Sequence, residues 1–78
     1  MFTIYSKVNC PYCEKIEKVF QIKEITYKKY LLNVDYSRDQ FIREFGPRAT
    51  FPKVLTQEGE LIGGAAETVK YLKENNLV

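Results

Sequence analysis

At the start of the chain, a short β-favouring stretch is followed by hydrophobic residues at helical spacing. Residues 2–5 favour the β conformation and predict a short strand. After them, Cys13, Ile16 and the next apolar residues fall on one side at helical spacing, while the charged residues, Glu17 included, take the other side. This pattern predicts an amphipathic helix over residues 11–23.

The middle of the chain predicts a second strand and a second helix. Residues 26–34 form a mostly apolar, tyrosine-rich run, and we expect a strand there although its in/out alternation is poor. Ser37 followed by Gln40 matches a capping box, and the Gly-Pro pair at residues 46–47 is a stop signal. The apolar residues between these signals form one face, which indicates a short helix.

The last third predicts a hairpin and a third helix. Residues 53–56 and 60–62 are brief apolar stretches separated by a loop that contains Gly59, as in a β-hairpin. From Ala65 to Asn75 the apolar positions recur again at helical spacing. The order βαβαββα begins with a βαβ unit, whose strands are parallel, and the hairpin adds antiparallel strands. We therefore predict an α/β fold in which helices cover both faces of a four-stranded mixed sheet.

Composition narrows the class of protein. The 78 residues, 45% of them hydrophobic, suffice for a single domain over residues 1–78. The net charge is +2, with cations spread among acidic residues, so we expect no nucleic-acid partner. No apolar run approaches the roughly 20 residues that a membrane helix needs, and the first residues lack the pattern of a signal peptide. We therefore expect a soluble, cytoplasmic protein with no membrane partner.

Cys10 and Cys13 are the only cysteines of a chain that has no histidine. As a structural disulfide they would close a very small ring, which removes little entropy from the unfolded chain, and a cytosolic protein would not keep it oxidised. A zinc site normally takes four Cys or His ligands, so it would need carboxylates or a second subunit. Both interpretations are disfavoured, and a redox-active pair is the favoured one.

A redox pair requires an exposed thiolate at neutral pH with a second thiol in reach. Pro11 suits the first position of a helix because its missing N–H would have no partner there, so Cys10 becomes the N-cap. The helix terminus favours the thiolate and can lower a cysteine pKa to roughly 3.5–7.5. We expect Cys13, one turn later, to be more buried, less acidic and within reach of Cys10. Such a pair between the first strand and the first helix is thioredoxin-like.

The chain resembles the glutaredoxin family in four short stretches. In the order that the family uses, these are residues 5–7, the Cys-Pro-Tyr-Cys motif at 10–13, residues 48–52 and residues 62–64. The Pro-Tyr pair between the cysteines is the glutaredoxin version of the motif. The resemblance spans almost the whole chain. It implies a thioredoxin fold and a glutathione-dependent thiol–disulfide oxidoreductase, with Cys10 as the nucleophile and Cys13 as the resolving thiol.

The resemblance also implies a glutathione site. Pro52 matches the family's cis-proline, and the backbone of the preceding residue, Phe51, would pair with the cysteinyl part of glutathione. Lys7 and Arg48 match basic positions near the glycine carboxylate, which arginine can hold with two N–H groups and lysine with a point charge. Tyr12 is expected to be exposed and to shape the groove. The other residues implied in this site are Thr50, Gly64, Ala65, Ala66 and Glu67.

The chain departs from the family pattern after residues 63–64. The family commonly has one or two aspartates there, whereas this chain has Ala65, Ala66 and Glu67. Neither alanine can cap a helix as aspartate or serine would. We therefore expect free N–H groups that receive the γ-glutamyl carboxylate of glutathione, with Glu67 facing its ammonium group. Weaker or less selective glutathione binding than is usual would follow.

Two other functions stay open at this point. One is a thioredoxin-like electron donor that a reductase recharges, against which the basic pair and the Pro-Tyr motif argue. In the other, two chains and two glutathione molecules bridge an iron–sulfur cluster through Cys10. For the oxidoreductase we expect no metal and a monomer. Its implied partners are glutathione and disulfide-containing or glutathionylated proteins, with ribonucleotide reductase among the candidates.

Overall fold

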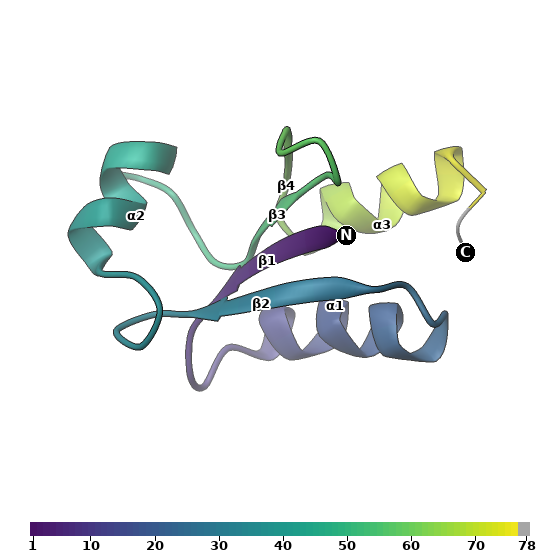
Figure 1. Cartoon of the computed structure of the whole chain (residues 1–78), viewed down its shortest axis with the longest axis horizontal. Helices are drawn as coiled ribbons and strands as arrows, with labels where there is room; N and C mark the ends of the chain where they lie inside the picture. Colours follow the sequence, from purple (N-terminus) through teal and green to yellow (C-terminus); the bar gives the residue numbers. More distant parts are fainter. Residues whose placement is uncertain (77–78) are drawn as a thin grey trace.

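The computed structural model describes residues 1–76, whose helices and strands follow the predicted order βαβαββα (Figure 1). They are β1 (Phe2–Ser6), α1 (Pro11–Ile22), β2 (Tyr27–Leu31), α2 (Arg38–Phe45), β3 (Lys53–Leu55), β4 (Leu61–Gly63) and α3 (Ala65–Glu74). Within residues 1–76, none of the three helices is long and apolar enough to cross a membrane.

The four strands form one mixed sheet in the order β2-β1-β3-β4. β1 and β2 are parallel, with Ile4 opposite Lys29, as the helical connection between them requires. β3 is antiparallel to both β1 and β4. Gly59 has φ 87°, a conformation that glycine adopts readily in a tight turn, and it lies in the loop of the β3-β4 hairpin. The predicted mixed sheet is confirmed.

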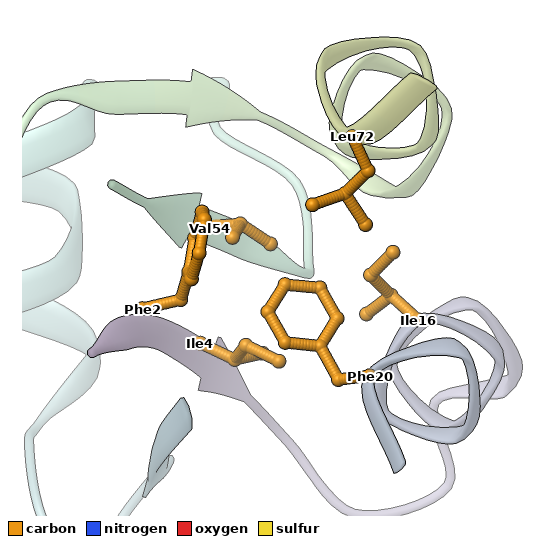
Figure 2. Packing of buried hydrophobic residues seen from close by; sticks show 6 residues of the cluster. All are labelled: Phe2, Ile4, Ile16, Phe20, Val54 and Leu72. Carbon is orange, nitrogen blue, oxygen red and sulfur yellow. The ribbon is translucent and has the colours of Figure 1, made fainter. Parts of the chain in front are cut away.

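Helices α1 and α3 cover one face of this sheet and enclose the main core. Figure 2 shows how side chains from both helices meet those of β1 and β3 at Phe2, Ile4, Ile16, Phe20, Val54 and Leu72. Phe20 is fully buried, and its ring lies edge-on to Phe2 and Tyr27 at centroid distances of 5.3 and 5.4 Å. The apolar side predicted for α1 is therefore the side that faces the sheet.

Aromatic side chains fill the opposite face of the sheet where β1 ends. The Tyr5 ring lies edge-on to Tyr36 and Phe45, with centroids 5.1 and 5.2 Å away. The Tyr36 hydroxyl donates a hydrogen bond of 2.7 Å to the Ser6 carbonyl oxygen. α2 lies at this end of the sheet (Figure 1) and packs on Tyr5 through Phe41 and Phe45, so helices cover both faces as predicted.

Replacing Tyr36 with phenylalanine is expected to lower the free energy of unfolding by about 1 kcal/mol, because the bond to the Ser6 carbonyl is lost. Burial, with smaller contributions from Tyr5 and Asp35, raises the pKa of the Tyr36 phenol above its ordinary value of 10.0. The unfolded chain therefore ionises first, and the wild type loses stability above about pH 10. Urea unfolding near neutral pH and at about pH 11 should show a smaller alkaline loss in Tyr36→Phe. A Tyr12→Phe control, at an exposed tyrosine, should match the wild type; equal alkaline losses in both variants would contradict this account.

The strand predicted over residues 26–34 is too long. β2 ends at Leu31, whose N–H donates a 2.8 Å hydrogen bond to the Asp35 carboxylate across a turn. Asn33 has φ 66° in this turn, a left-handed conformation that asparagine tolerates. Val34 extends the apolar pattern in the sequence, yet it is 73% exposed. The turn's own hydrogen bonds, which the apolar pattern does not report, end the strand.

Candidate active site

The two cysteines lie between the end of β1 and the first turn of α1. Cys10 is the N-cap of α1 and Pro11 is the first helical residue, as predicted. The Cys10 Sγ accepts a hydrogen bond of 3.2 Å from the Cys13 N–H, and the two cysteines form a disulfide with Cα atoms 5.2 Å apart. Asn9 has φ 55°, which turns the chain into the helix. This geometry places the sulfur of Cys10 against the unpaired N–H groups of a helix terminus.

The exposure of the cysteines differs from the expectation in one respect. Cys13 is 1% exposed, as expected for the inner residue, but Cys10 is only 5% exposed. The bond to Cys13 and the hydrogen bond from its N–H hold the Cys10 sulfur over the first helical turn. Cys10 still lines a cleft, whereas Cys13 is not among the lining residues. The lowered pKa expected for Cys10 concerns the reduced protein and stays a prediction.

A cleft of about 330 Å³ opens beside Cys10. Its walls come from the β1-α1 loop, the start of α1, the start of α2 and the loop before β3. The residues that line it are Lys7, Asn9, Cys10, Pro11, Tyr12, Arg38, Ala49, Thr50 and Phe51. Three separate segments of the sequence therefore meet at the reactive sulfur.

The cleft is basic. Lys7 and Arg38 are both exposed and are its two charged lining residues, so this set carries no carboxylate. The Lys7 Nζ lies 5.3 Å from the centroid of the Phe51 ring, a cation–π distance that keeps the cation at the cleft wall. Positive charge in a concave, partly apolar site attracts anions, and a thiolate at Cys10 would be stabilised in the same way.

At the start of α3 the N-cap residue makes no side-chain hydrogen bond to the first turn, as expected, but one N–H group is taken by Glu67. Gly64 is the N-cap, and its N–H donates a hydrogen bond of 2.7 Å to the Glu67 carboxylate. This N–H group is therefore not free for a ligand anion. Gly63 has φ 133°, and a Cβ there would lie 3.0 Å from the Cβ and Cγ of Glu67. Only glycine fits this position, because any side chain would be strained and would displace the cap.

A second, apolar groove lies on the other side of Tyr12. Ala65 and Ala66, at the start of α3, line it together with Tyr12 and the outer part of α1. Tyr12 is 62% exposed, as predicted, and it lines both the basic cleft and this groove.

Below the cysteines, Glu17 joins three elements. It lies one helical turn after Cys13. The charge pattern predicted that Glu17 lies on the solvent side of α1, but the residue is buried. The Ser6 hydroxyl donates to one oxygen of its carboxylate at 3.2 Å, and the Lys29 ammonium lies 3.1 Å from the other. A buried carboxylate needs such partners. The i, i+4 spacing from Cys13 to Glu17 was the available sequence signal for this burial.

Within residues 1–76, no group of three or more His, Cys, Asp or Glu side chains lies close enough together to hold a metal ion. The Phe51–Pro52 peptide bond is cis, as the family resemblance implied.

The sequence model of the glutaredoxin family matches residues 2–62. This chain belongs to the glutaredoxin family. The matched region runs from β1 to β4 and contains both cysteines and every residue that lines the basic cleft. The family prediction made from four short stretches of sequence is confirmed.

Curated members of the family are similar over nearly the whole chain. Mitochondrial glutaredoxin-2 of Mus musculus is 32% identical over 78 residues, which is 96% of this chain and 49% of the mouse protein. Glutaredoxin 1 of Rickettsia prowazekii is 25% identical over 76 residues, with 95% and 79% of the two chains covered. The chain thus spans about half the length of the mouse glutaredoxin.

Solved glutaredoxin structures share the fold. The buckwheat glutaredoxin–glutathione complex superimposes with a TM-score of 0.78 at 25% identity, covering 97% of this chain and 71% of the buckwheat chain. Glutaredoxin 1 of Francisella tularensis, in complex with cacodylate, also gives 0.78 at 25% identity and covers 97% and 94% of the two chains. The predicted thioredoxin fold is confirmed.

The structure separates the predicted site residues into two groups. Lys7, Cys10, Tyr12, Thr50 and Phe51 line the basic cleft. The others, Cys13, Arg48, Pro52, Gly64, Ala65, Ala66 and Glu67, are not among its lining residues.

Arg48 is exposed and lies outside the lining of the cleft, whereas Arg38 lies within it. Sequence reasoning missed Arg38 because it belongs to α2, which reaches the cleft only through the packing of that helix over β1. Asn9 was also missed, although its place directly before the motif was a usable signal.

Proposed function

We propose that this chain is a glutathione-dependent thiol–disulfide oxidoreductase that reduces protein disulfides and glutathione mixed disulfides. The observation that carries the proposal is the Cys10–Cys13 pair at the N-terminus of α1, with Cys10 lining a basic cleft. Membership of the glutaredoxin family and the similar buckwheat protein, which was solved with glutathione, support it.

Reduction of a glutathione mixed disulfide needs only Cys10. Its thiolate attacks the glutathione sulfur, so that a Cys10–glutathione disulfide forms and the substrate thiolate leaves and takes up a proton. A second glutathione, as its thiolate, then attacks the glutathione sulfur of this intermediate. Glutathione disulfide forms, and the Cys10 thiolate is restored. The helix terminus and the nearby Lys7 stabilise that thiolate in both steps.

Reduction of a protein disulfide also needs Cys13. The Cys10 thiolate attacks one substrate sulfur, and the other substrate sulfur leaves as a thiolate that takes up a proton. Cys13 then loses its proton and attacks the Cys10 sulfur, which releases the second substrate thiol. The enzyme is left with the Cys10–Cys13 disulfide that the structure contains. Two glutathione molecules reduce this disulfide and leave as glutathione disulfide.

The cleft suggests how glutathione would bind. Lys7 and Arg38 would hold its glycine carboxylate, and the backbone of Phe51, with Thr50 beside it, would pair with the cysteinyl part next to Cys10. The start of α3, from Gly64 to Glu67, lies beyond Tyr12 and would meet the γ-glutamyl end. There the Glu67 carboxylate already accepts the Gly64 N–H, so it would face the ligand's ammonium group rather than leave that N–H to the ligand's carboxylate.

We expect Arg38→Ala to raise the KM for a small glutathione mixed disulfide about threefold to fivefold, the range of an exposed charge pair, with kcat little changed. Arg48→Ala should have little effect, because Arg48 lies outside the cleft. A coupled assay of glutathione disulfide formation measures both variants. Arg43→Ala, at another exposed arginine of α2, is the matched control. A larger effect for Arg48→Ala than for Arg38→Ala would reassign the carboxylate contact.

The same assay tests the function itself. Turnover with glutathione supports the proposal, whereas reduction only by a thioredoxin reductase would favour the thioredoxin-like electron donor. A coloured protein after anaerobic purification would favour the iron–sulfur carrier. For the cell we propose a monomer in the cytoplasm, because a dithiol recharged by glutathione needs a reducing compartment. Its protein substrates would be disulfide-containing or glutathionylated proteins.

A further inference from the structure

The apolar groove between α1 and α3 is larger than the basic cleft. Its volume is about 510 Å³, against about 330 Å³ for the cleft. The residues that line it are Tyr12, Lys15, Ile16, Lys18, Val19, Ile22, Ala65, Ala66 and Val69. Ile22, at the far end, is 66% exposed. Because a large isoleucine side chain is exposed to water at the end of an apolar groove, a molecule that covers it would bind with a favourable hydrophobic contribution.

The groove begins at the reaction centre. Tyr12 lines both the groove and the cleft that contains Cys10. From Tyr12 the groove follows α1 to Ile22, which is about 15 Å at the rise of an α-helix. That length matches four or five residues of extended chain. Glutathione has three residues and its sulfur must lie at Cys10, so its γ-glutamyl end would reach only the Ala65–Ala66 part of the groove and would leave the part toward Ile22 open.

The positive charge along the groove favours an acidic ligand. Lys15 and Lys18 are the charged residues that line it, and both are exposed. The Lys15 Nζ lies 5.4 Å from the centroid of the Tyr12 ring, directly next to the reaction centre. The nearby Glu67 carboxylate accepts the Gly64 N–H at 2.7 Å and so is turned toward the start of α3. An apolar groove with two lysines on its α1 side complements a polypeptide that carries both apolar and acidic side chains.

We propose that this groove binds the polypeptide segment next to the reacting cysteine of a protein substrate, a segment with apolar residues and at least one Asp or Glu. The proposal rests on the oxidoreductase function and names its preferred protein substrates. Continuity with the cleft through Tyr12, the length of the groove and the two lysines carry it. The groove thereby gives the protein a preference for polypeptide substrates over small disulfides, which contact only the site at Cys10.

The test compares three glutathionylated peptides with a small mixed disulfide of glutathione and 2-mercaptoethanol. Each peptide has one cysteine followed by five residues: apolar with two glutamates, apolar with two lysines, or glycine and serine only. We expect kcat/KM for the acidic apolar peptide to exceed that for each of the other two by about tenfold, from the covered apolar surface and the charge pairs. Equal values for the three peptides, or a preference for the lysine peptide, would overturn the proposal.

Variants locate the effect in the groove. Ile22→Gln and Lys18→Glu should each lower kcat/KM for the acidic apolar peptide about threefold to tenfold and leave the small mixed disulfide unchanged. Val34→Gln, at an exposed valine in the β2-α2 turn, and Lys73→Glu, in the last turn of α3, are the matched controls. Unchanged peptide kinetics in both groove variants would overturn the proposal.

Binding without chemistry separates this proposal from the oxidoreductase function. The acidic apolar peptide is made with serine in place of cysteine, and its affinity is measured by titration of the oxidised protein. Binding that Ile22→Gln weakens, without turnover of the small mixed disulfide, would reject the enzyme and keep the docking groove. Turnover of the small mixed disulfide without such binding would keep the enzyme and reject the groove.

Discussion

Replacing Cys10 with serine is expected to abolish thiol–disulfide exchange with every substrate. Both proposed routes begin with attack by the Cys10 sulfur, and a serine hydroxyl is not ionised at neutral pH and cannot take its place. The fold should survive, because residue 10 remains the N-cap of α1, and a serine hydroxyl can accept the Cys13 N–H in place of the Cys10 sulfur. Exchange at the uncatalysed rate, with unchanged circular dichroism, is the predicted result. Residual turnover well above background would mean that Cys13 can act as a nucleophile.

Cys13→Ser is the matched variant, and its result should depend on the substrate. A glutathione mixed disulfide is reduced through Cys10 alone, so activity toward it should persist. A protein disulfide needs Cys13 to release the mixed disulfide, so its reduction should be lost. The buried position of Cys13, 1% exposed, agrees with a residue that meets only the Cys10 sulfur. If Cys13→Ser were as inactive as Cys10→Ser toward the glutathione mixed disulfide, the two cysteines would not divide the reaction in this way.

The second large effect is on stability. Phe20→Ala should lower the free energy of unfolding by about 3–5 kcal/mol, since it removes a fully buried ring and leaves a cavity between α1 and the sheet. A domain of this size has only about 4–12 kcal/mol in total. The variant should therefore unfold at a much lower urea concentration and a much lower temperature, and its activity should disappear with the fold.

Ile22→Ala is the control for Phe20→Ala. Ile22 is on the same helix and also loses an apolar side chain, but it is 66% exposed. Its free energy of unfolding should change by less than about 1 kcal/mol. Urea unfolding of both variants, followed by circular dichroism, compares them directly. Similar losses in the two would mean that Phe20 does not centre the core as its packing against Phe2 and Tyr27 indicates.

Local signals in the sequence determined most of the fold. The capping box at Ser37, Pro11 after an N-cap cysteine and the glycine of the hairpin each depend on neighbouring backbone groups, so the sequence alone placed them correctly. The reactive pair was also determined locally, because its chemistry depends on the helix terminus at which Cys10 lies. The prediction was wrong at Val34, where the apolar pattern indicated a strand and the residue lies exposed in a turn.

The composition of the cleft was decided only by the tertiary structure. Arg38 and Phe51 lie thirteen positions apart in the sequence, and Arg38 reaches the cleft because α2 packs over β1 through Tyr5. Arg48 is nearer to Phe51 in the sequence and yet lies outside the cleft lining.

The burial of Glu17 was also decided by the tertiary structure. A charged residue at this position is expected to face solvent, but Ser6 and Lys29, from two strands, give its carboxylate the partners that make burial possible. The sequence by itself therefore determined the elements, their order and the two reactive cysteines. The tertiary structure decided which cations line the cleft beside them and which carboxylate is buried on α1. These contacts join segments that are far apart in the sequence, and no local pattern predicts that such segments lie together.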